Sequence, residues 1–149
     1  MLSIGICLAA GFIGSIFTTP AIPVWYATLQ KPFFTPPNWV FGPAWTTLYI
    51  LMGIALFLVW NKGIQDRKVQ VAMGVFGVQL VLNSLWSILF FGMQNPFYAF
   101  IEVIILWFAI LATIILFYGI DKRASFLLVP YILWVSFASV LNYYVWILN

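Results

Sequence analysis

The chain has 149 residues and carries five long apolar runs. Each run approaches the roughly 20 residues that an α-helix needs to cross about 30 Å of hydrocarbon. Charged residues make up 6% of the chain, whereas soluble domains carry about 25%. The sequence therefore predicts an all-α membrane protein, a five-transmembrane-helix bundle in a single domain over residues 1–149. The predicted helices cover about residues 2–19, 43–60, 69–91, 96–119 and 125–148.

A long connection rich in proline and aromatic residues separates the first two runs. Five prolines and eight aromatic residues lie between Pro23 and Tyr49, and we expect the loop itself to cover residues 23–42. Each proline fixes φ and disfavours helix at the residue before it, so the loop should be stiff. Structureless connections of this length are uncommon in compact domains unless they are functional. The pattern is typical of a lid over a ligand pocket.

Basic residues predict the orientation in the membrane. Five of the six lie in the short connections 61–68 and 120–124, whereas the long loop carries only Lys31. Because positive connections stay in the cytoplasm, the N-terminus is predicted to be cytoplasmic and the long loop and C-terminus to lie outside. The net charge of +3 is thus explained by topology, and no nucleic-acid partner is predicted.

The reactive residues needed for familiar chemistry are scarce. The chain has no histidine and one cysteine, Cys7, which excludes a disulfide framework and removes the commonest metal ligand and general base. No catalytic triad or phosphate loop is present. We therefore expect no metal site, no obligatory cofactor and no conventional acid–base or nucleophilic catalysis. A bound porphyrin would be held by its ring rather than through its metal.

Helical spacing gathers polar and aromatic residues in the outer half of the predicted bundle. At 1.5 Å per residue, Tyr49, Trp86, Glu102 and Asn142 each lie roughly 8 to 9 Å below the outer helix ends, and Asn83 roughly 14 to 15 Å. Amides are costly in lipid, so these faces should point inward. An alternative stays open, in which the asparagines tie helices together and the aromatics only pack. The candidate lining residues are Tyr49, Asn83, Trp86, Trp134, Ala138 and Asn142.

Glu102 is the one acidic residue within an apolar run. An ionisable residue inside a membrane is by default a hypothesis of function. The alternatives are that Glu102 reaches the outer interface or pairs with Lys31. A proton relay would need further titratable groups in the core, so a proton-coupled transporter is not predicted.

Three long motifs carry a resemblance to a known family. They are W-Y-x-x-L-x-K-P-x-F-x-P-P-x-W-x-F-x-P-x-W-x-x-L-Y from Trp25 to Tyr49, Q-L-x-L-N-x-x-W-S-x-L-F-F at residues 79–91, and P-Y-x-L-W-x-x-F-A-x-x-L-N from Pro130 to Asn142. Together they resemble the signature of the translocator protein and tryptophan-rich sensory protein (TspO/MBR) family. The resemblance covers essentially the whole chain.

The resemblance implies a five-helix bundle whose cavity binds porphyrins, haem and isoquinoline or benzodiazepine-type drugs. Family members have been linked to stress sensing and tetrapyrrole homeostasis, and often form dimers. Trp45 and Trp134 match two tryptophans implicated in light-dependent porphyrin breakdown. Three functions therefore stay open: a receptor or sensor, a porphyrin-degrading enzyme that uses light and oxygen, and a transporter of tetrapyrroles or lipids. The family's drug-site positions correspond to Tyr26, Asn83, Ala138 and Ser139.

The family's sterol motif is incomplete in this chain. Tyr143 and Tyr144 follow Leu141, but no basic residue comes after them. The motif is weak even when complete, so cholesterol binding is not predicted. The short C-terminus fits a prokaryotic cell membrane, and the small residues Ala10 and Gly14 permit close helix packing within one chain or in a homodimer.

Overall fold

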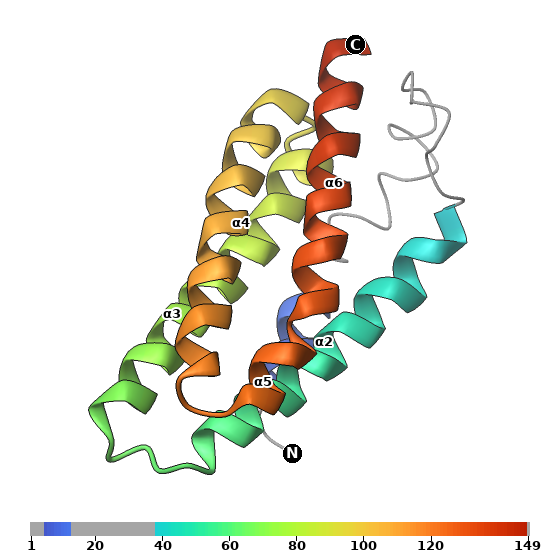
Figure 1. The fold of residues 1–149 in the computed structure, drawn as a ribbon. Helices are drawn as coiled ribbons and strands as arrows, with labels where there is room; N and C mark the ends of the chain where they lie inside the picture. The colour runs from blue at the N-terminus through green and yellow to red at the C-terminus, as the bar shows by residue number, and fades with distance from the viewer. Residues whose placement is uncertain (1–4, 13–37, 149) are drawn as a thin grey trace.

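A computed structural model describes residues 5–12 and 38–148, and regular structure within these ranges is helical throughout. A short helix covers residues 5–12, and the helix of the third predicted span ends in a π-helical stretch. The chain then turns back on itself repeatedly, so that successive long helices run antiparallel (Figure 1). The elements are α2 (Asn38–Trp60), α3 (Arg67–Ser87), η2 (Ile88–Gly92), α4 (Pro96–Tyr118), α5 (Lys122–Leu127) and α6 (Val129–Leu148).

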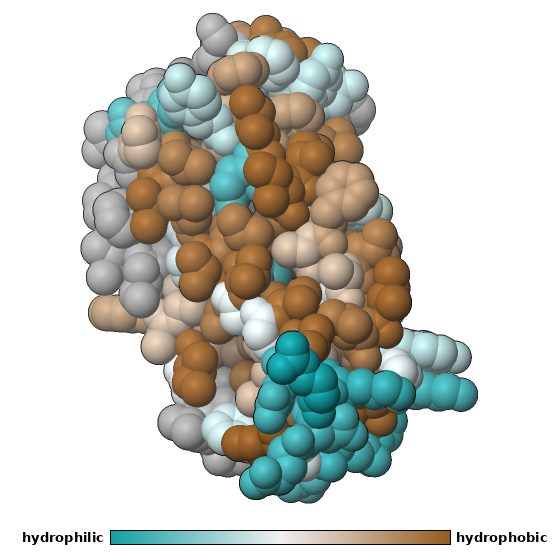
Figure 2. Space-filling view, turned by 90° about the vertical axis from the view of Figure 1, so that its left-hand side faces the viewer, coloured by the Kyte–Doolittle hydropathy of each residue, from teal (hydrophilic) through white to brown (hydrophobic). Residues whose placement is uncertain are grey.

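Within residues 5–12 and 38–148, four helical stretches are long and apolar enough to cross a membrane. Large apolar side chains on their outer surfaces stay exposed, among them Val81 at 69% and Ile115 at 63%. Figure 2 shows hydrophobic side chains over much of one face and hydrophilic ones gathered at its lower end. The stretches are Pro43–Trp60, Arg67–Phe90, Pro96–Tyr118 and Lys122–Leu148.

The expected first span and the long loop are only partly described. Of the predicted helix at residues 2–19, the structure describes residues 5–12, which are helical. Of the lid predicted at residues 23–42, residues 23–37 lie outside the described residues. A five-span bundle therefore stays a prediction.

The second helix begins earlier than expected. α2 starts at Asn38, five residues before the predicted start at Pro43, so residues 38–42 are helical rather than loop. Only the first four N–H groups of a helix lack partners, so a proline beyond them removes one backbone hydrogen bond. Pro43 is the sixth residue of α2 and loses only one backbone bond, while its carbonyl accepts a hydrogen bond from Thr47 Oγ1 at 2.8 Å.

The last predicted helix, residues 125–148, is two helices. α5 ends at Leu127, and α6 starts at Val129. The break comes from Pro130, which has no N–H and whose ring crowds the carbonyl of Phe126 one turn earlier. The N–H of Leu128 instead bonds to the carbonyl of Ser125 at 3.1 Å.

Two ends of the bundle differ in charge. The connections 61–66 and 119–121 lie together at one end, which we call the basic end (Figure 1). The start of α2, the turn at residues 93–95 and the end of α6 lie toward the other, which we call the opposite end. α4 packs against α3 and α6, and α5 packs against α2 near the basic end.

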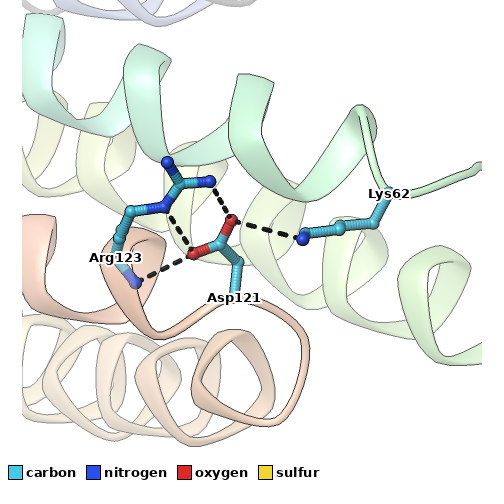
Figure 3. A network of polar contacts seen from close by, with 3 residues as sticks. All are labelled: Lys62, Asp121 and Arg123. Atoms are coloured by element: carbon cyan, nitrogen blue, oxygen red, sulfur yellow. Dashed lines mark hydrogen bonds and ion pairs between the residues drawn. The ribbon is translucent and has the colours of Figure 1, made fainter.

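A carboxylate fastens the basic end (Figure 3). Asp121 caps α5 by accepting from the backbone N–H of Arg123 at 2.9 Å, and it also accepts from the guanidinium of Arg123 at 3.0 and 3.2 Å. Lys62 Nζ, from the connection after α2, lies 3.9 Å from the same carboxylate. The hydrogen bonds from Arg123 hold the pKa of Asp121 below its ordinary value. This network ties the connection after α2 to the start of α5.

Candidate functional site

Three tryptophans from three helices meet in the half of the bundle nearer the opposite end. The Trp45 ring on α2 lies 6.4 Å from that of Trp86 on α3 and 6.3 Å from that of Trp134 on α6, measured between ring centroids. These spacings fall within the range in which aromatic rings attract one another. Trp45 also stacks on Tyr49, with centroids 5.8 Å apart. Trp45, Trp86 and Trp134 are each half-buried, and we call them the tryptophan cluster.

A chain of buried hydrogen bonds lies beside the tryptophan cluster. The hydroxyl of Tyr49 donates to Asn83 Oδ1, and Asn83 Nδ2 donates to the hydroxyl of Tyr131 at 2.7 Å. That hydroxyl donates to Gln79 Oε1 at 2.7 Å, and Gln79 Nε2 donates to Met52 Sδ at 3.8 Å. We call these five residues the polar chain. It joins α2, α3 and α6, and it satisfies groups that would be costly to bury unpaired.

The early start of α2 corrects the predicted depths. Counted from Asn38, Trp45 lies roughly 10 Å and Tyr49 roughly 16 Å along the helix. Tyr49 was expected level with Trp86, but its hydroxyl reaches the deeper Asn83. Trp45 takes the level of Trp86 instead. An error of five residues at the helix start therefore moves each α2 side chain by more than one turn.

Asn142 braces the site from α6. Trp86 Nε1 donates to Asn142 Oδ1 at 3.0 Å, and Asn142 Nδ2 donates to the carbonyl of Pro96 at 2.9 Å. The amide thus links α3, α6 and the start of α4. The geometry therefore shows Asn142 tying helices together, and its hydrogen bond holds the indole of Trp86 in place.

Ser139, Ala138 and Tyr26 are the other predicted ligand-binding residues. Ser139 is buried, and its hydroxyl donates within α6 to the carbonyl of Val135 at 2.7 Å. Ala138, half-buried, follows Trp134 by one turn. Tyr26 lies outside the described residues.

Sequence reasoning missed Tyr131 as a site residue and kept Gln79 only as part of a helix face. Tyr131 is 1% exposed and forms the centre of the polar chain. A signal was present, because Tyr131, Val135, Ala138 and Asn142 repeat at the spacing of one helix face.

Glu102 is buried rather than reaching an interface. Its side chain is 6% exposed, and neither carboxyl oxygen has a hydrogen-bond partner among residues 5–12 and 38–148. Lys31, its predicted alternative partner, lies outside those ranges.

The described residues contain no group of three or more histidine, cysteine or acidic side chains that could hold a metal ion. What they bring together is aromatic surface and neutral hydrogen-bonding groups. This arrangement suits a flat, largely apolar molecule held by stacking and a few polar contacts.

Comparison with known proteins gives one consistent result. A sequence model of the TspO/MBR family matches residues 3–147. The "Tryptophan-rich protein TspO" of Archaeoglobus fulgidus is 51% identical over 143 residues, covering 95% of this chain and 91% of that protein. The human "Translocator protein" is 40% identical over 136 residues, covering 91% and 80%. The "Tryptophan-rich sensory protein" of Cereibacter sphaeroides is 38% identical over 119 residues, covering 80% and 73%.

Proposed function

The chain belongs to the TspO/MBR family and is a multi-pass membrane protein, and from this premise we propose that it is a sensor that binds a porphyrin or related tetrapyrrole. The ligand would rest on the tryptophan cluster. Relatives named as a sensory protein and as a translocator protein support a role in sensing or moving a small molecule.

The observation that carries the proposal is the meeting of Trp45, Trp86 and Trp134. Half-buried indoles on three separate helices offer flat apolar area without needing a metal ligand, which suits a chain that has no histidine. Stacking and burial of apolar surface would supply most of the affinity. The same surface would accept the isoquinoline and benzodiazepine-type drugs implied by the family resemblance.

The polar chain supports the proposal by holding the floor of this surface. Asn83 has its carbonyl engaged by Tyr49 and one N–H engaged by Tyr131. Since an amide carries two N–H donors, one donor of Asn83 has no partner among the residues that the structure describes, and it could meet a polar group of the ligand. Asn83 would then set the ligand's orientation, and the tryptophans would set its affinity.

Orientation follows from charge. We propose that the basic end faces the cytoplasm, because Lys62, Arg67, Lys68, Lys122 and Arg123 lie there and such residues are retained on that side. The tryptophan cluster would then lie in the outer half. Relatives from Archaeoglobus fulgidus and Cereibacter sphaeroides favour a prokaryotic cell membrane.

Binding of protoporphyrin to the detergent-purified protein, followed by the absorption band of the porphyrin, tests this site. The double variant Trp45→Ala plus Trp134→Ala should weaken binding at least about tenfold, because each lost aromatic contact is worth about 0.5 to 1.5 kcal/mol beyond its buried area. The matched control is Trp60→Ala plus Trp146→Ala, which removes two tryptophans away from the cluster. Equal affinity in the two double variants would place the porphyrin elsewhere.

A second candidate is light-dependent porphyrin breakdown. The favouring observation is the edge-to-face approach of Trp45 to Trp134 together with the stack of Trp45 on Tyr49, a run of oxidisable rings in contact. Illumination of the complex in oxygen should give a new absorbing product, and Trp45→Phe plus Trp134→Phe should not. If free porphyrin bleaches to the same product at the same rate, the enzyme hypothesis fails.

A third candidate, transport of tetrapyrroles or lipids, rests on the name of the human relative. It requires the ligand to leave by the basic end as well as by the opposite end. Porphyrin flux across proteoliposomes that exceeds the flux across empty vesicles would support it, and equal flux would exclude it.

A further inference from the structure

Glu102 lies on the buried stripe of α4. Ala99, Val103 and Leu106, its neighbours on that stripe, are at most 1% exposed, and Glu102 itself is 6% exposed. Both of its carboxyl oxygens lack a hydrogen-bond partner within the described ranges 5–12 and 38–148. Buried polar groups are normally paired, because an unpaired one loses its water without compensation. An acid left in this state has unused capacity to donate and accept a hydrogen bond.

Contacts between α4 and α6 fix the level of Glu102 in the bundle. On one side of it, the Phe100 ring meets the Tyr143 ring at 5.4 Å. On the other side, Trp107 Nε1 donates to Ser136 Oγ at 2.8 Å. Glu102 therefore lies level with the stretch of α6 between Ser136 and Tyr143.

The tryptophan cluster occupies the same levels. Trp86 is bonded to Asn142, next to Tyr143, and Trp134 is two residues from Ser136. α4 packs against both α3 and α6, the helices that carry these two indoles (Figure 1). The carboxyl is thus buried in the layer that would hold the ligand.

No charged side chain of the described residues can neutralise Glu102. α4 continues for 16 residues from Glu102 to its end at Tyr118, roughly 24 Å along the helix axis, and the other charged groups of the described residues lie beyond that point, at the basic end. On α6 the nearest titratable groups by level are Tyr143 and Tyr144, both exposed. The buried hydroxyl of Tyr131, deeper on α6, is also close enough to interact electrostatically with Glu102, and α3 and η2 carry no titratable group near this level. An unpaired buried carboxylate ion would be very costly, so the burial of Glu102 favours the neutral acid. The other charged residues are Lys62, Asp66, Arg67, Lys68, Asp121, Lys122 and Arg123.

We propose that Glu102 is the anchor for a basic ring nitrogen of the ligand, and that the protein selects flat apolar molecules carrying such a nitrogen. This inference rests on the proposed function. The neutral carboxylic acid donates its proton to the lone pair of the nitrogen, so that the O–H bond breaks, an N–H bond forms, and the carboxylate accepts a hydrogen bond from the new cation. Both partners enter uncharged and the complex has no net charge, so no ion is carried alone into the bundle. The imine-type nitrogens of a metal-free tetrapyrrole and those of aromatic aza-heterocycles have this chemistry.

A matched pair of ligands isolates the nitrogen. Acridine and anthracene have the same three fused rings, but acridine replaces one central C–H by a basic nitrogen. Binding of each to the protein in nanodiscs is measured by energy transfer from tryptophan, with protein-free nanodiscs correcting for partition into lipid. The proteins compared are wild type, Glu102→Gln, and Trp45→Ala plus Trp134→Ala. Glutamine keeps the shape of the side chain and removes the transferable proton.

Wild type should bind acridine about tenfold more tightly than anthracene, since one charge-assisted hydrogen bond is worth at least about a factor of ten. Glu102→Gln should bind both ligands with the affinity that wild type has for anthracene. Acridine bound to wild type should show the absorption of the acridinium cation, and acridine bound to Glu102→Gln should not. A variant that merely failed to fold would lose anthracene binding as well. An infrared band of a protonated carboxyl that is present in the empty protein and absent in Glu102→Gln should disappear when acridine binds.

The outcomes separate the two claims. If both ligands bind wild type equally and acridine stays neutral, the assignment of Glu102 is wrong while the proposed binding function stands. If the double tryptophan variant binds both ligands more weakly by the same factor, and still binds acridine more tightly than anthracene, both claims are supported. If neither ligand binds wild type, the proposed function fails, and the inference fails with it.

Discussion

The hydroxyl of Tyr131 is the central link of the polar chain, and its removal is the sharpest test of what holds the site. It accepts from Asn83 Nδ2 and donates to Gln79 Oε1, each at 2.7 Å. The side chain is 1% exposed, so water cannot replace the lost oxygen. Tyr131→Phe keeps the ring and leaves one N–H and one carbonyl unpaired inside the bundle.

The expected loss of stability follows from two broken bonds. Hydrogen bonds between helices in membranes contribute about 0.6 kcal/mol on average and up to about 1.7 kcal/mol. Tyr131→Phe should therefore lower the free energy of unfolding by about 1 to 3 kcal/mol, with the higher end reached if neither partner finds a new one. Tyr49→Phe breaks a single bond at the end of the chain and should cost about half as much.

Reversible unfolding by dodecyl sulfate in mixed micelles, followed by tryptophan fluorescence, measures both variants. Tyr143→Phe is the matched control, because Tyr143 lies on the same helix and is 40% exposed, and phenylalanine keeps its packing against Phe100. The double variant Tyr49→Phe plus Tyr131→Phe should lose less than the sum of the single losses, because both hydroxyls hold the same Asn83 amide. If Tyr131→Phe is no less stable than Tyr143→Phe, the polar chain does not stabilise the bundle.

Two further predictions concern the helix at residues 5–12 and the basic end. A Cβ at Gly11 would lie 2.6 Å from Tyr49 Cε2, so Gly11→Ala should push the Tyr49 ring aside and destabilise the protein by about 1 to 3 kcal/mol. The control is Gly74→Ala, because a Cβ at Gly74 would meet nothing within 4 Å. Equal melting temperatures of the two variants would contradict the close approach of Gly11 to Tyr49. Because Arg123 lowers the pKa of Asp121 below its ordinary value of about 3.9, the carboxylate should contribute stability above that pH and lose it as the pH falls through the lower folded pKa. Asp121→Asn should remove this acid limb from a plot of melting temperature against pH. The control is Asp66→Asn, which changes the N-cap of α3; an unchanged limb in Asp121→Asn would show that other groups cause it.

The sequence predicted which residues form the site better than it predicted the hydrogen bonds that join them. Trp86 and Trp134 were among the candidate lining residues because of their place in apolar helices, and Trp45 was named through the family resemblance. The structure brings the Trp45 ring into contact with both of the others. Asn83 was expected to face inward because amides are costly in lipid, and it is 2% exposed. Tyr131 was not among the candidate lining residues, although it lies within the motif from Pro130 to Asn142. Nothing local to it shows that its hydroxyl joins two amides on another helix.

Helix boundaries show the same limit. Pro43 was expected to open a helix, as proline often does, but α2 begins at Asn38 and includes it. Pro130 was expected inside one long helix, but it separates α5 from α6. The same ring is accommodated at one position and breaks the helix at the other. Pro130 is the second residue of α6, where the missing N–H would lack a partner anyway, whereas Pro43 lies in the second turn of α2 and removes one backbone bond. Which of these a proline does depends on where its helix starts, and the sequence alone does not show that.

The sequence by itself determined that this chain enters a membrane, that its spans are helical, and that it lacks histidine, the commonest metal ligand. These properties depend on each segment separately. A segment enters the bilayer if its apolar stretch is long enough, and it must be helical because a helix pairs its own backbone N–H and C=O groups. Only the tertiary structure decided that Tyr49 reaches Asn83 rather than the level of Trp86, that Asn142 braces an indole, and that the Glu102 carboxyl is buried without a partner among the described residues. The physical reason is that a hydrogen bond between helices depends on their relative register and rotation, and a shift of one turn exchanges one partner for another.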